Sequence, residues 1–210
     1  MAVINKPKDY DTTPEQGEFV APVPGGHRMI IHQVLRTESK GGRPMLKIDY
    51  DFDPTDAQPK LFETEYRNDI RPEKKWPRGG TNYVMEETSD GGTSRSFKTF
   101  CSCAEKSNSG FKIPWGAEQK VWESSFKGKK IGGVFGQVEN FYNGKTTTRT
   151  ELRWFCQYDR AEDASIPDLK PLSEKQKRAA VNWKAAEEAQ EQTGFMNIPD
   201  DVADEGLPFN

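Results

Sequence analysis

The sequence has few of the residues from which metal sites and nucleophilic sites are usually built. Among its 210 residues there are three cysteines and two histidines. Cys101 and Cys103 flank a single serine and Cys156 lies far away, so the paired C-x-x-C spacing of a zinc site is missing. His27 and His32 lie at an odd spacing on an expected strand, which points them to opposite faces. We therefore expect no metal site.

Sequence signatures of enzymes are also missing. The glycine-rich segment 91–97 lacks the Gly-Lys-Ser/Thr sequence of a phosphate-binding loop, and no serine stands in a G-x-S-x-G context. Acidic residues are plentiful but scattered, with no spacing that singles out a carboxylate pair. A nuclease or recombinase would need a carboxylate cluster that holds a metal ion. We therefore expect neither catalysis nor a cofactor.

Long apolar runs are the third absence. No run approaches the roughly 18 apolar residues of a membrane-spanning helix, and the first residues lack the apolar core of a signal peptide. Three cysteines cannot all pair within one chain, which favours reduced thiols in a cytosolic compartment. We expect a cytoplasmic protein without membrane contact.

The charge that is present is divided unevenly along the chain. Residues 161–210 hold 5 Lys and Arg against 11 Asp and Glu, a net charge of -6. Residues 1–160 hold 25 basic and 22 acidic residues, a net charge of +3. Such asymmetry is typical of a cationic binding body that carries an acidic tail.

Hydrophobic patterning predicts a mainly β body. Residues 25–39, 44–52 and 60–66 are expected to form three strands, and residues 94–108 have the apolar spacing of a helix. Two further strand patterns flank the Asn-Gly turn at 142–145, the strongest short-range signal for a β-hairpin.

Two of these strands show a clear alternation of side chains, which predicts which face is buried. In the second strand the face predicted to be buried consists of Leu46, Ile48, Tyr50 and Phe52, and the face predicted to be wet consists of Met45, Lys47, Asp49 and Asp51. In the last strand one face consists of Leu152, Trp154, Cys156 and Tyr158, and the other of Arg149, Arg153, Phe155 and Gln157.

Three strands, a helix and a two-stranded hairpin are the elements of an OB fold. We therefore predict a five-stranded OB barrel with one helix between strands three and four and an irregular insertion over residues 67–92. This nucleic-acid-binding domain would span residues 1–160, including an N-terminal arm. Residues 161–210 would form a linker, a marginal helix with Ser173 as its N-cap, and a disordered acidic tail. An exposed strand edge or the arm would allow a homodimer.

Cations interleaved with aromatic rings predict a surface for single-stranded nucleic acid. Charges follow the phosphates and rings stack on bases, whereas a protein that reads duplex needs no such rings. The loops between strands one and two and between strands four and five flank the groove of an OB barrel. The candidates are Lys40 and Arg43 in the first loop, Arg67, Arg71, Lys74, Lys75, Trp76, Arg78 and Tyr83 in the insertion, Tyr142 and Lys145 at the hairpin turn, Arg149, Arg153 and Phe155 on the last strand, and Phe135 and Phe141 on the strand that faces it.

The C-terminus carries a more specific signal. Acidic residues there are followed almost at once by an apolar anchor: Asp200, Asp201, Asp204 and Glu205 precede Leu207, Pro208 and Phe209. A terminus needed only for solubility leaves Phe209 unexplained. This segment resembles the acidic tip of bacterial single-stranded DNA-binding proteins, which closes on Asp-Ile-Pro-Phe. It departs from that pattern at Leu207 and at Asn210, which follows the phenylalanine.

The body is more similar to phage-encoded OB-fold proteins found near replication and recombination genes. Segments 39–52 and 126–145 carry this similarity. The resemblance implies a phage-type single-stranded DNA-binding protein in the cytoplasm of an infected bacterium, whose tip recruits replication or recombination proteins. An alternative interpretation is a non-enzymatic protein-interaction module with an OB-type or β-sandwich body.

Overall fold

The computed structural model describes residues 6–8, 10 and 20–193, and within them the chain is mainly β. Its strands are β1 (Gly25–Glu38), β2 (Pro44–Phe52), β3 (Thr81–Met85), β4 (Lys130–Tyr142) and β5 (Lys145–Cys156). Its helices are α1 (Leu61–Asn68), α2 (Arg95–Ser107), α3 (Gln119–Ser124) and α4 (Glu174–Thr193), with short 3₁₀ turns at Arg78–Gly80 and Tyr158–Arg160. None of the helices described is long and apolar enough to cross a membrane.

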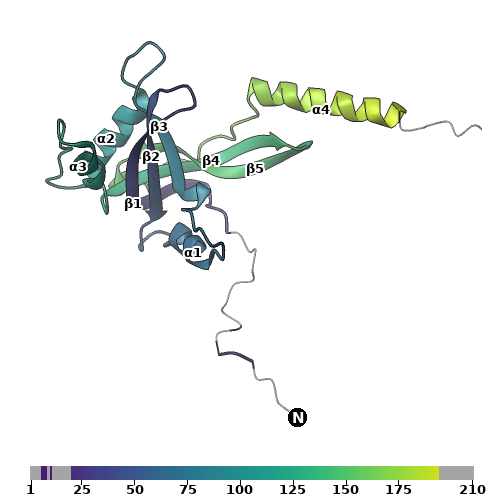
Figure 1. Cartoon of the computed structure of the whole chain (residues 1–210). Helices are drawn as coiled ribbons and strands as arrows, with labels where there is room; N and C mark the ends of the chain where they lie inside the picture. The colour runs from purple at the N-terminus through teal and green to yellow at the C-terminus, as the bar shows by residue number, and fades with distance from the viewer. Residues whose placement is uncertain (1–5, 9, 11–19, 194–210) are drawn as a thin grey trace, which may run out of the picture. The chain divides into compact units, whose positions relative to one another are not determined.

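The five strands form one antiparallel sheet in the order β3-β2-β1-β4-β5 (Figure 1). The prediction of a closed barrel is wrong for the part of the chain that the structure describes, because β3 and β5 are edge strands of an open sheet. The short β3 explains part of this result. With 5 residues against the 9 of β2, it offers little backbone for a second partner.

The predicted third strand, residues 60–66, is the helix α1. Leu61 and Phe62 pack on the core, and Tyr66 follows Phe62 at the four-residue spacing of a helix. The carboxylate of Asp51 accepts hydrogen bonds from the backbone N–H groups of Phe62 and Glu63, at 2.9 Å each. A side chain from β2 therefore caps this helix. The actual third strand lies inside the segment predicted to be irregular.

The core forms where one face of the sheet meets α1 and α2. Leu46, Ile48, Tyr50 and Phe52 are all buried, as the alternation of β2 predicts. The opposite face of β2 is not simply wet, because Asp49 is also buried. Its carboxylate accepts hydrogen bonds from Lys47 Nζ at 2.8 Å and from Thr81 Oγ1 at 2.6 Å. These polar partners offset the cost of burying the charge.

The helix predicted over residues 94–108 is confirmed as α2. The hydroxyl of Ser94 accepts a hydrogen bond from the N–H of Phe97 at 3.2 Å and so caps its first turn. Phe100 and Ala104, four residues apart, are completely buried on one face of the helix. The neighbouring Cys101 is a buried free thiol, as expected of a small apolar side chain.

The chain forms two compact units, and the smaller one combines residues 139–148 with residues 171–210. The hairpin turn in this unit confirms the Asn-Gly prediction, since Asn143 and Gly144 have φ angles of 47° and 76°. Both residues of a type I′ turn need such positive angles. Helix α4 begins next to Ser173, whose hydroxyl accepts a hydrogen bond from the N–H of Gln176 at 3.4 Å. The predicted acidic tip, from Asp200 to Phe209, lies outside the described residues.

Candidate nucleic-acid interface

The outer face of β1, β2 and β3, opposite the core, is accessible to solvent near the β1–β2 turn, whereas Asp49 on the same face is buried. The strand register places Leu35, Lys47 and Tyr83 side by side in one row across the three strands. Tyr83 is 58% exposed, whereas Leu35 and Lys47 are half-buried. An exposed ring on a flat, partly apolar floor is a suitable platform for a base.

A second row on this face lies nearer the β1–β2 turn. Thr37, Met45 and Met85 are neighbours across the same strands. The two methionines are half-buried and extend the apolar floor beside Tyr83. Lys47 is the cation within the two rows, and its ammonium lies 2.8 Å from Asp49 Oδ2. The charge of these rows is therefore largely neutralised locally.

The outer face of β4 differs because a later segment covers it. The backbone N–H of Lys170 donates to the carbonyl of Gln137 at 3.0 Å. Pro167 packs so closely that a Cβ atom at Gly136 would lie 2.5 Å from its ring. Residues 161–170 thus cover the outer face of β4 around Gly136. The same segment covers the start of β1, because a Cβ atom at Gly26 would meet the carbonyl group of Ala161.

The turn between β1 and β2 carries cations without partners. Lys40 and Arg43 are exposed, and neither side chain forms an ion pair with any residue that the structure describes. The turn is closed by backbone bonds from Ser39 N to Arg43 O at 2.8 Å and from Gly42 N to Ser39 O at 2.9 Å. Gly42 has a φ angle of 72°, which favours glycine. A rigid turn therefore presents two uncompensated charges.

The insertion carries cations that mostly have internal partners. The Arg67 guanidinium pairs with Glu63, and Arg71 Nη2 lies 2.7 Å from Asp69 Oδ2. Lys74 Nζ donates to the carbonyl of Arg67 at 2.9 Å. The adjacent Lys75 and Arg78 are exposed.

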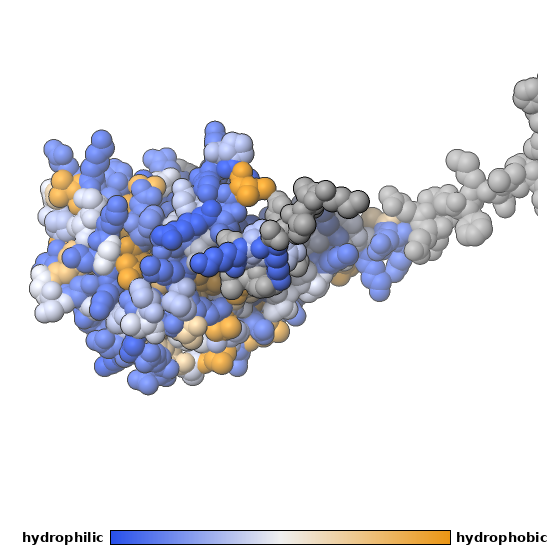
Figure 2. All heavy atoms as spheres, turned by 90° about the horizontal axis from the view of Figure 1, so that it is seen from below, coloured by the Kyte–Doolittle hydropathy of each residue, from blue (hydrophilic) through white to orange (hydrophobic). Residues whose placement is uncertain are grey.

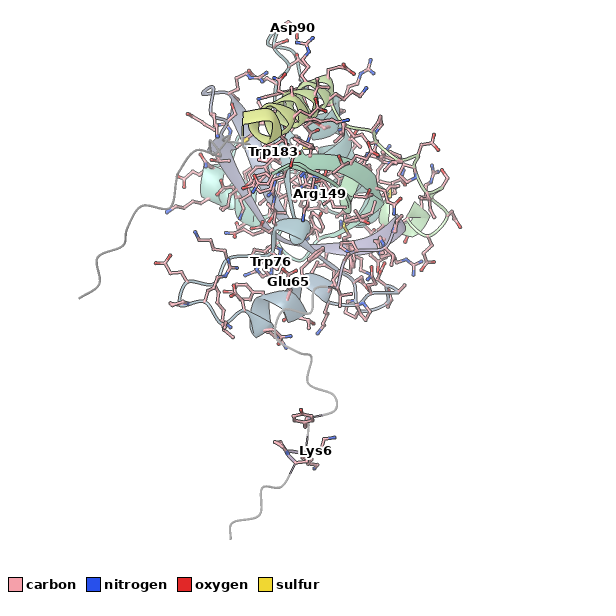
Figure 3. The ribbon with its side chains drawn as sticks, turned by 90° about the vertical axis from the view of Figure 1, so that its right-hand side faces the viewer. Lys6, Glu65, Trp76, Asp90, Arg149 and Trp183 are labelled. Carbon is pink, nitrogen blue, oxygen red and sulfur yellow. The ribbon has the colours of Figure 1, made fainter. Side chains whose placement is uncertain are left out.

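These insertion residues lie at the α1 end of the sheet. Figure 3 shows Trp76 and Glu65 close to this end, while Asp90 marks the loop at the opposite end. The β1–β2 turn shares the end of the β3–α2 loop (Figure 1). The structure therefore does not bring the insertion cations together with Lys40 and Arg43.

Trp76 is engaged in holding the insertion on the sheet. Its indole N–H donates to the carbonyls of Tyr50 and Gly80, at 3.2 and 3.0 Å. Its ring stacks on His32, with centroids 4.2 Å apart and an interplanar angle of 8°. His32 lies at a bulge in β1 between Ile31 and Gln33, on the face opposite the buried Ile31. Trp76 is thus a structural contact.

Two predicted stacking residues are in the core, and those predictions are wrong. Phe135 is 0% exposed and Phe155 is 5% exposed. Phe155 packs against Phe100 of α2, with ring centroids 5.2 Å apart. The strict alternation assumed for the last strand fails there, because Leu152 also packs on the core while Trp154 is 46% exposed.

The cations predicted on β5 also have partners. Arg149 Nε lies 2.6 Å from Glu151 Oε1. The Arg153 guanidinium donates to the carbonyls of Gln137 and Asp168, at 3.4 and 3.2 Å. Arg153 therefore fastens the segment that covers β4.

The smaller unit holds the remaining predicted residues. Tyr142 and Lys145 are exposed at the hairpin turn, and Phe141 is half-buried. Trp183 of α4 packs on this turn, since a Cβ atom at Gly144 would lie 2.5 Å from its Nε1. Tyr142 and Lys145 therefore remain accessible to a ligand.

Sequence reasoning did not assign a group of aromatic residues between α2 and α3. Trp115 is 62% exposed and Trp122 is half-buried, and both line a cavity with Phe97. The signal was present in the sequence, because residues 111–127 interleave aromatic rings with lysines. The insertion shows the same interleaving of aromatic rings with cations.

Metal ligands and thiols are the two kinds of reactive group that the described residues allow us to assess. Within them, no group of three or more His, Cys, Asp or Glu side chains is placed to hold a metal ion. Burial raises the pKa of the Cys101 thiol to about 12 and that of the Cys156 thiol to about 11. Both thiols are therefore protonated at neutral pH and poor nucleophiles.

Comparison with known proteins adds no assignment. No protein-family model matches this sequence, and no curated protein is detectably similar to it.

Proposed function

We propose that this chain is a sequence-tolerant single-stranded DNA-binding protein that acts in phage DNA replication or recombination, without catalysis. The observation that carries the proposal is the open face of β1, β2 and β3 beside an unpaired cationic turn. Tyr83 is exposed on a half-buried apolar floor, and Lys40 and Arg43 have no internal partner among the described residues. Bases would stack on Tyr83 while phosphates contact the turn.

The strand order supports an OB-type body. In an OB fold, strand one lies between strands two and four, as β1 lies between β2 and β4 here. The binding surface of that fold uses the face of strands two and three and the loop between strands one and two. The open rows and the β1–β2 turn are the corresponding parts of this chain.

Partner recruitment is proposed for the C-terminal tip. Asp200, Asp201, Asp204 and Glu205 would contact cations on a replication or recombination protein, and Phe209 would enter an apolar pocket. Such a peptide gains about 25 cal/mol per Å² of apolar surface buried on its partner. Deletion of residues 199–210 is expected to abolish partner capture and to leave DNA binding intact or stronger.

Fluorescence titration with oligothymidine and with a duplex of equal length tests the proposal. The five Trp residues supply the signal. Single-stranded binding is expected to be tighter, and the logarithm of the binding constant should fall with the logarithm of salt concentration by about 0.7 per phosphate contacted. Equal or tighter duplex binding would contradict the single-strand proposal.

A protein-interaction module is the second candidate function. The observation that favours it is the apolar floor itself, since Leu35, Met45 and Met85 would also suit a protein surface. Absence of oligonucleotide binding at low salt, together with capture of a protein partner, would support this candidate over the first.

A further inference from the structure

A cavity of about 330 Å³ lies between α2, the loop before α3, α3 itself and the ends of β1 and β3. Its lining includes the aromatic side chains of Phe97, Trp115 and Trp122 and the polar side chains of Arg36 and Glu86. Its volume is at the lower end of the range of about 300–1,000 Å³ for small-molecule sites. One ring system fits such a space better than a long ligand does.

The aromatic rings that line the cavity are inclined to one another, and one of them is exposed. The rings of Trp115 and Trp122 have centroids 6.0 Å apart and planes inclined by 46°. Phe97 lies edge-on to Trp115, with centroids 6.3 Å apart. Trp122 is anchored from behind by Phe126, at 4.7 Å. Trp115 therefore has an exposed ring, held next to a fixed one, that can stack on a planar ligand.

The polar wall carries no net charge. Arg36 Nε and Nη2 donate to Glu86 Oε1 and Oε2, at 2.8 and 3.0 Å. Hydrogen bonding with Glu86 and its negative charge raise the pKa of Arg36. Each carboxylate oxygen keeps a lone pair, and Nη1 keeps its hydrogens for a further acceptor. The wall thus offers donors and acceptors to a neutral polar ligand and has no excess charge to attract an ion.

We propose that this cavity binds one unstacked nucleobase of the single-stranded DNA; the inference rests on the proposed function. A base is planar, so it can stack on the aromatic wall. It is also neutral and has hydrogen-bond donors and acceptors on its edge, which match those of Arg36 and Glu86 on the polar wall. All four bases have such edges, so this pocket is compatible with sequence-tolerant binding.

The position of the cavity also fits the same strand of DNA. Arg36 is paired with Leu46, which is three residues from Arg43 in the cationic turn. Three residues span at most about 11 Å, so the turn and the cavity are close neighbours. Glu86 is at the same end of the sheet, because its N–H donates to the carbonyl of Pro44 at 3.1 Å. Arg36 shares the core face of the sheet with Leu46, whereas Tyr83 is on the opposite face. A strand of DNA that contacts both Tyr83 and the cavity would therefore pass round the end of the sheet at the turn.

The test compares Trp115→Ala with Trp154→Ala in the full-length chain, using oligothymidine. Trp154 is the control because it is also exposed but lies on β5, away from the cavity lining. Trp115→Ala should weaken binding about 10-fold, as expected for one stacked base. The dependence on salt should be unchanged, since no phosphate contact is lost. Trp154→Ala should bind within twofold of the unaltered protein.

Photocrosslinking supplies a second measurement that does not depend on affinity. An oligonucleotide with 5-iododeoxyuridine in place of thymidine should crosslink to the peptide that contains Trp115 or Trp122. Affinity of Trp115→Ala within twofold of the unaltered protein, with no crosslink in that peptide, would overturn the cavity proposal while single-strand binding stands. Failure of the unaltered protein to bind oligothymidine at low salt would overturn the proposed function and this inference together.

Discussion

The two ends of the sheet both carry cations, but the share of these cations that is paired differs. At the α1 end, Arg67 and Arg71 are paired with carboxylates and Lys74 with a carbonyl, whereas Lys75 and Arg78 are exposed and form no ion pair with the described residues. At the other end, Lys40 and Arg43 have no ion-pair partner among the described residues. A paired cation must first break its contact to bind a phosphate, whereas an unpaired one gives up only water. The state of a cation therefore identifies a binding surface better than the number of cations does.

The aromatic rings at the two ends of the sheet also differ in how accessible they are. The α1 end uses its aromatic ring, Trp76, to hold its own backbone. The other end has exposed rings at Tyr83 and Trp115. Figure 2 views the molecule from the side on which α1 lies in Figure 1, and its hydrophobic residues form separate spots among hydrophilic ones. These differences support the proposal that DNA binds at the turn end and that Trp76 at the α1 end has a structural role.

The largest expected effect is that of charge reversal at the turn. The double variant Lys40→Glu, Arg43→Glu should lose about 100-fold in affinity for oligothymidine at low salt, because it replaces two phosphate contacts by repulsion. The variant with both residues changed to alanine should lower the salt slope by about 1.4. Fluorescence titration at several salt concentrations measures both quantities.

The matched control is charge reversal at the opposite end, Arg67→Glu, Arg71→Glu. It changes the net charge of the chain equally, so a general electrostatic effect would appear in both variants. We expect less than a threefold loss of affinity here. An equal loss in the two double variants would show that position does not matter and would remove the distinction between the ends.

Trp76→Ala addresses the stability of the α1 end. The change removes a half-buried ring, its stacking on His32 and two hydrogen bonds to carbonyls. The free energy of unfolding should fall by about 2 kcal/mol, less than for a fully buried tryptophan. Urea denaturation measures this loss. Affinity for oligothymidine, measured under conditions in which the variant is folded, should be unchanged; a clear loss would place the insertion in the DNA site.

Tyr83→Ala should have the reverse pattern of Trp76→Ala: it should lower the affinity for DNA and leave the stability nearly unchanged. Loss of one stacking ring is expected to weaken oligothymidine binding about 10-fold. The free energy of unfolding should change by less than about 1 kcal/mol because the ring is mostly exposed. Tyr83→Phe keeps the ring and should bind like the unaltered protein. If Tyr83→Phe were as weak as Tyr83→Ala, a hydrogen bond of the hydroxyl group, and not stacking, would account for the contact.

Local signals in the sequence predicted most of the β-elements and helix α2. The alternation in β2, the Asn-Gly turn and the apolar spacing in residues 94–108 each depend on residues close together in the chain. The segment 60–66 was mispredicted because its helical state depends on Asp51, which lies 11 and 12 residues before the N–H groups that it caps. A distant cap of this kind is not visible in a local pattern.

The site was less predictable than the fold for a related reason. Residue type and spacing predicted Lys40 and Arg43 as binding residues together with many other cations, but they could not show which cations are paired. They also could not show that Phe135 and Phe155 enter the core. Burial of Phe155 depends on a departure from alternation near the end of β5, which no motif in the sequence marks. Pairing and burial are tertiary properties, and they decide which of the thirty cations and many rings are available to a ligand.

The smallest expected effect concerns Asp51, the carboxylate that caps α1. Burial is the largest influence on this group and raises its pKa, although three backbone N–H groups act in the opposite direction. The folded protein therefore holds this proton at pH values at which the unfolded chain, with an ordinary pKa of about 3.9, has released it. It follows that Asp51 lowers the free energy of unfolding as the pH rises from about 4 through its folded pKa.

Asp51→Asn removes the charge and keeps one acceptor oxygen for the N–H of Phe62, although its NH2 group cannot accept the bond from Glu63. At pH 7 its free energy of unfolding should be within about 1 kcal/mol of that of the unaltered protein, whereas Asp51→Ala should lose about 1–2 kcal/mol with the cap. Urea denaturation between pH 4 and pH 7 gives the difference between the two proteins at each pH. As the pH rises, the free energy of unfolding of Asp51→Asn should increase relative to that of the unaltered protein, because only the unaltered protein must ionise this carboxyl group. A constant difference would mean that ionisation of Asp51 is not costly, and that the α1 end tolerates charge as readily as the exposed turn does.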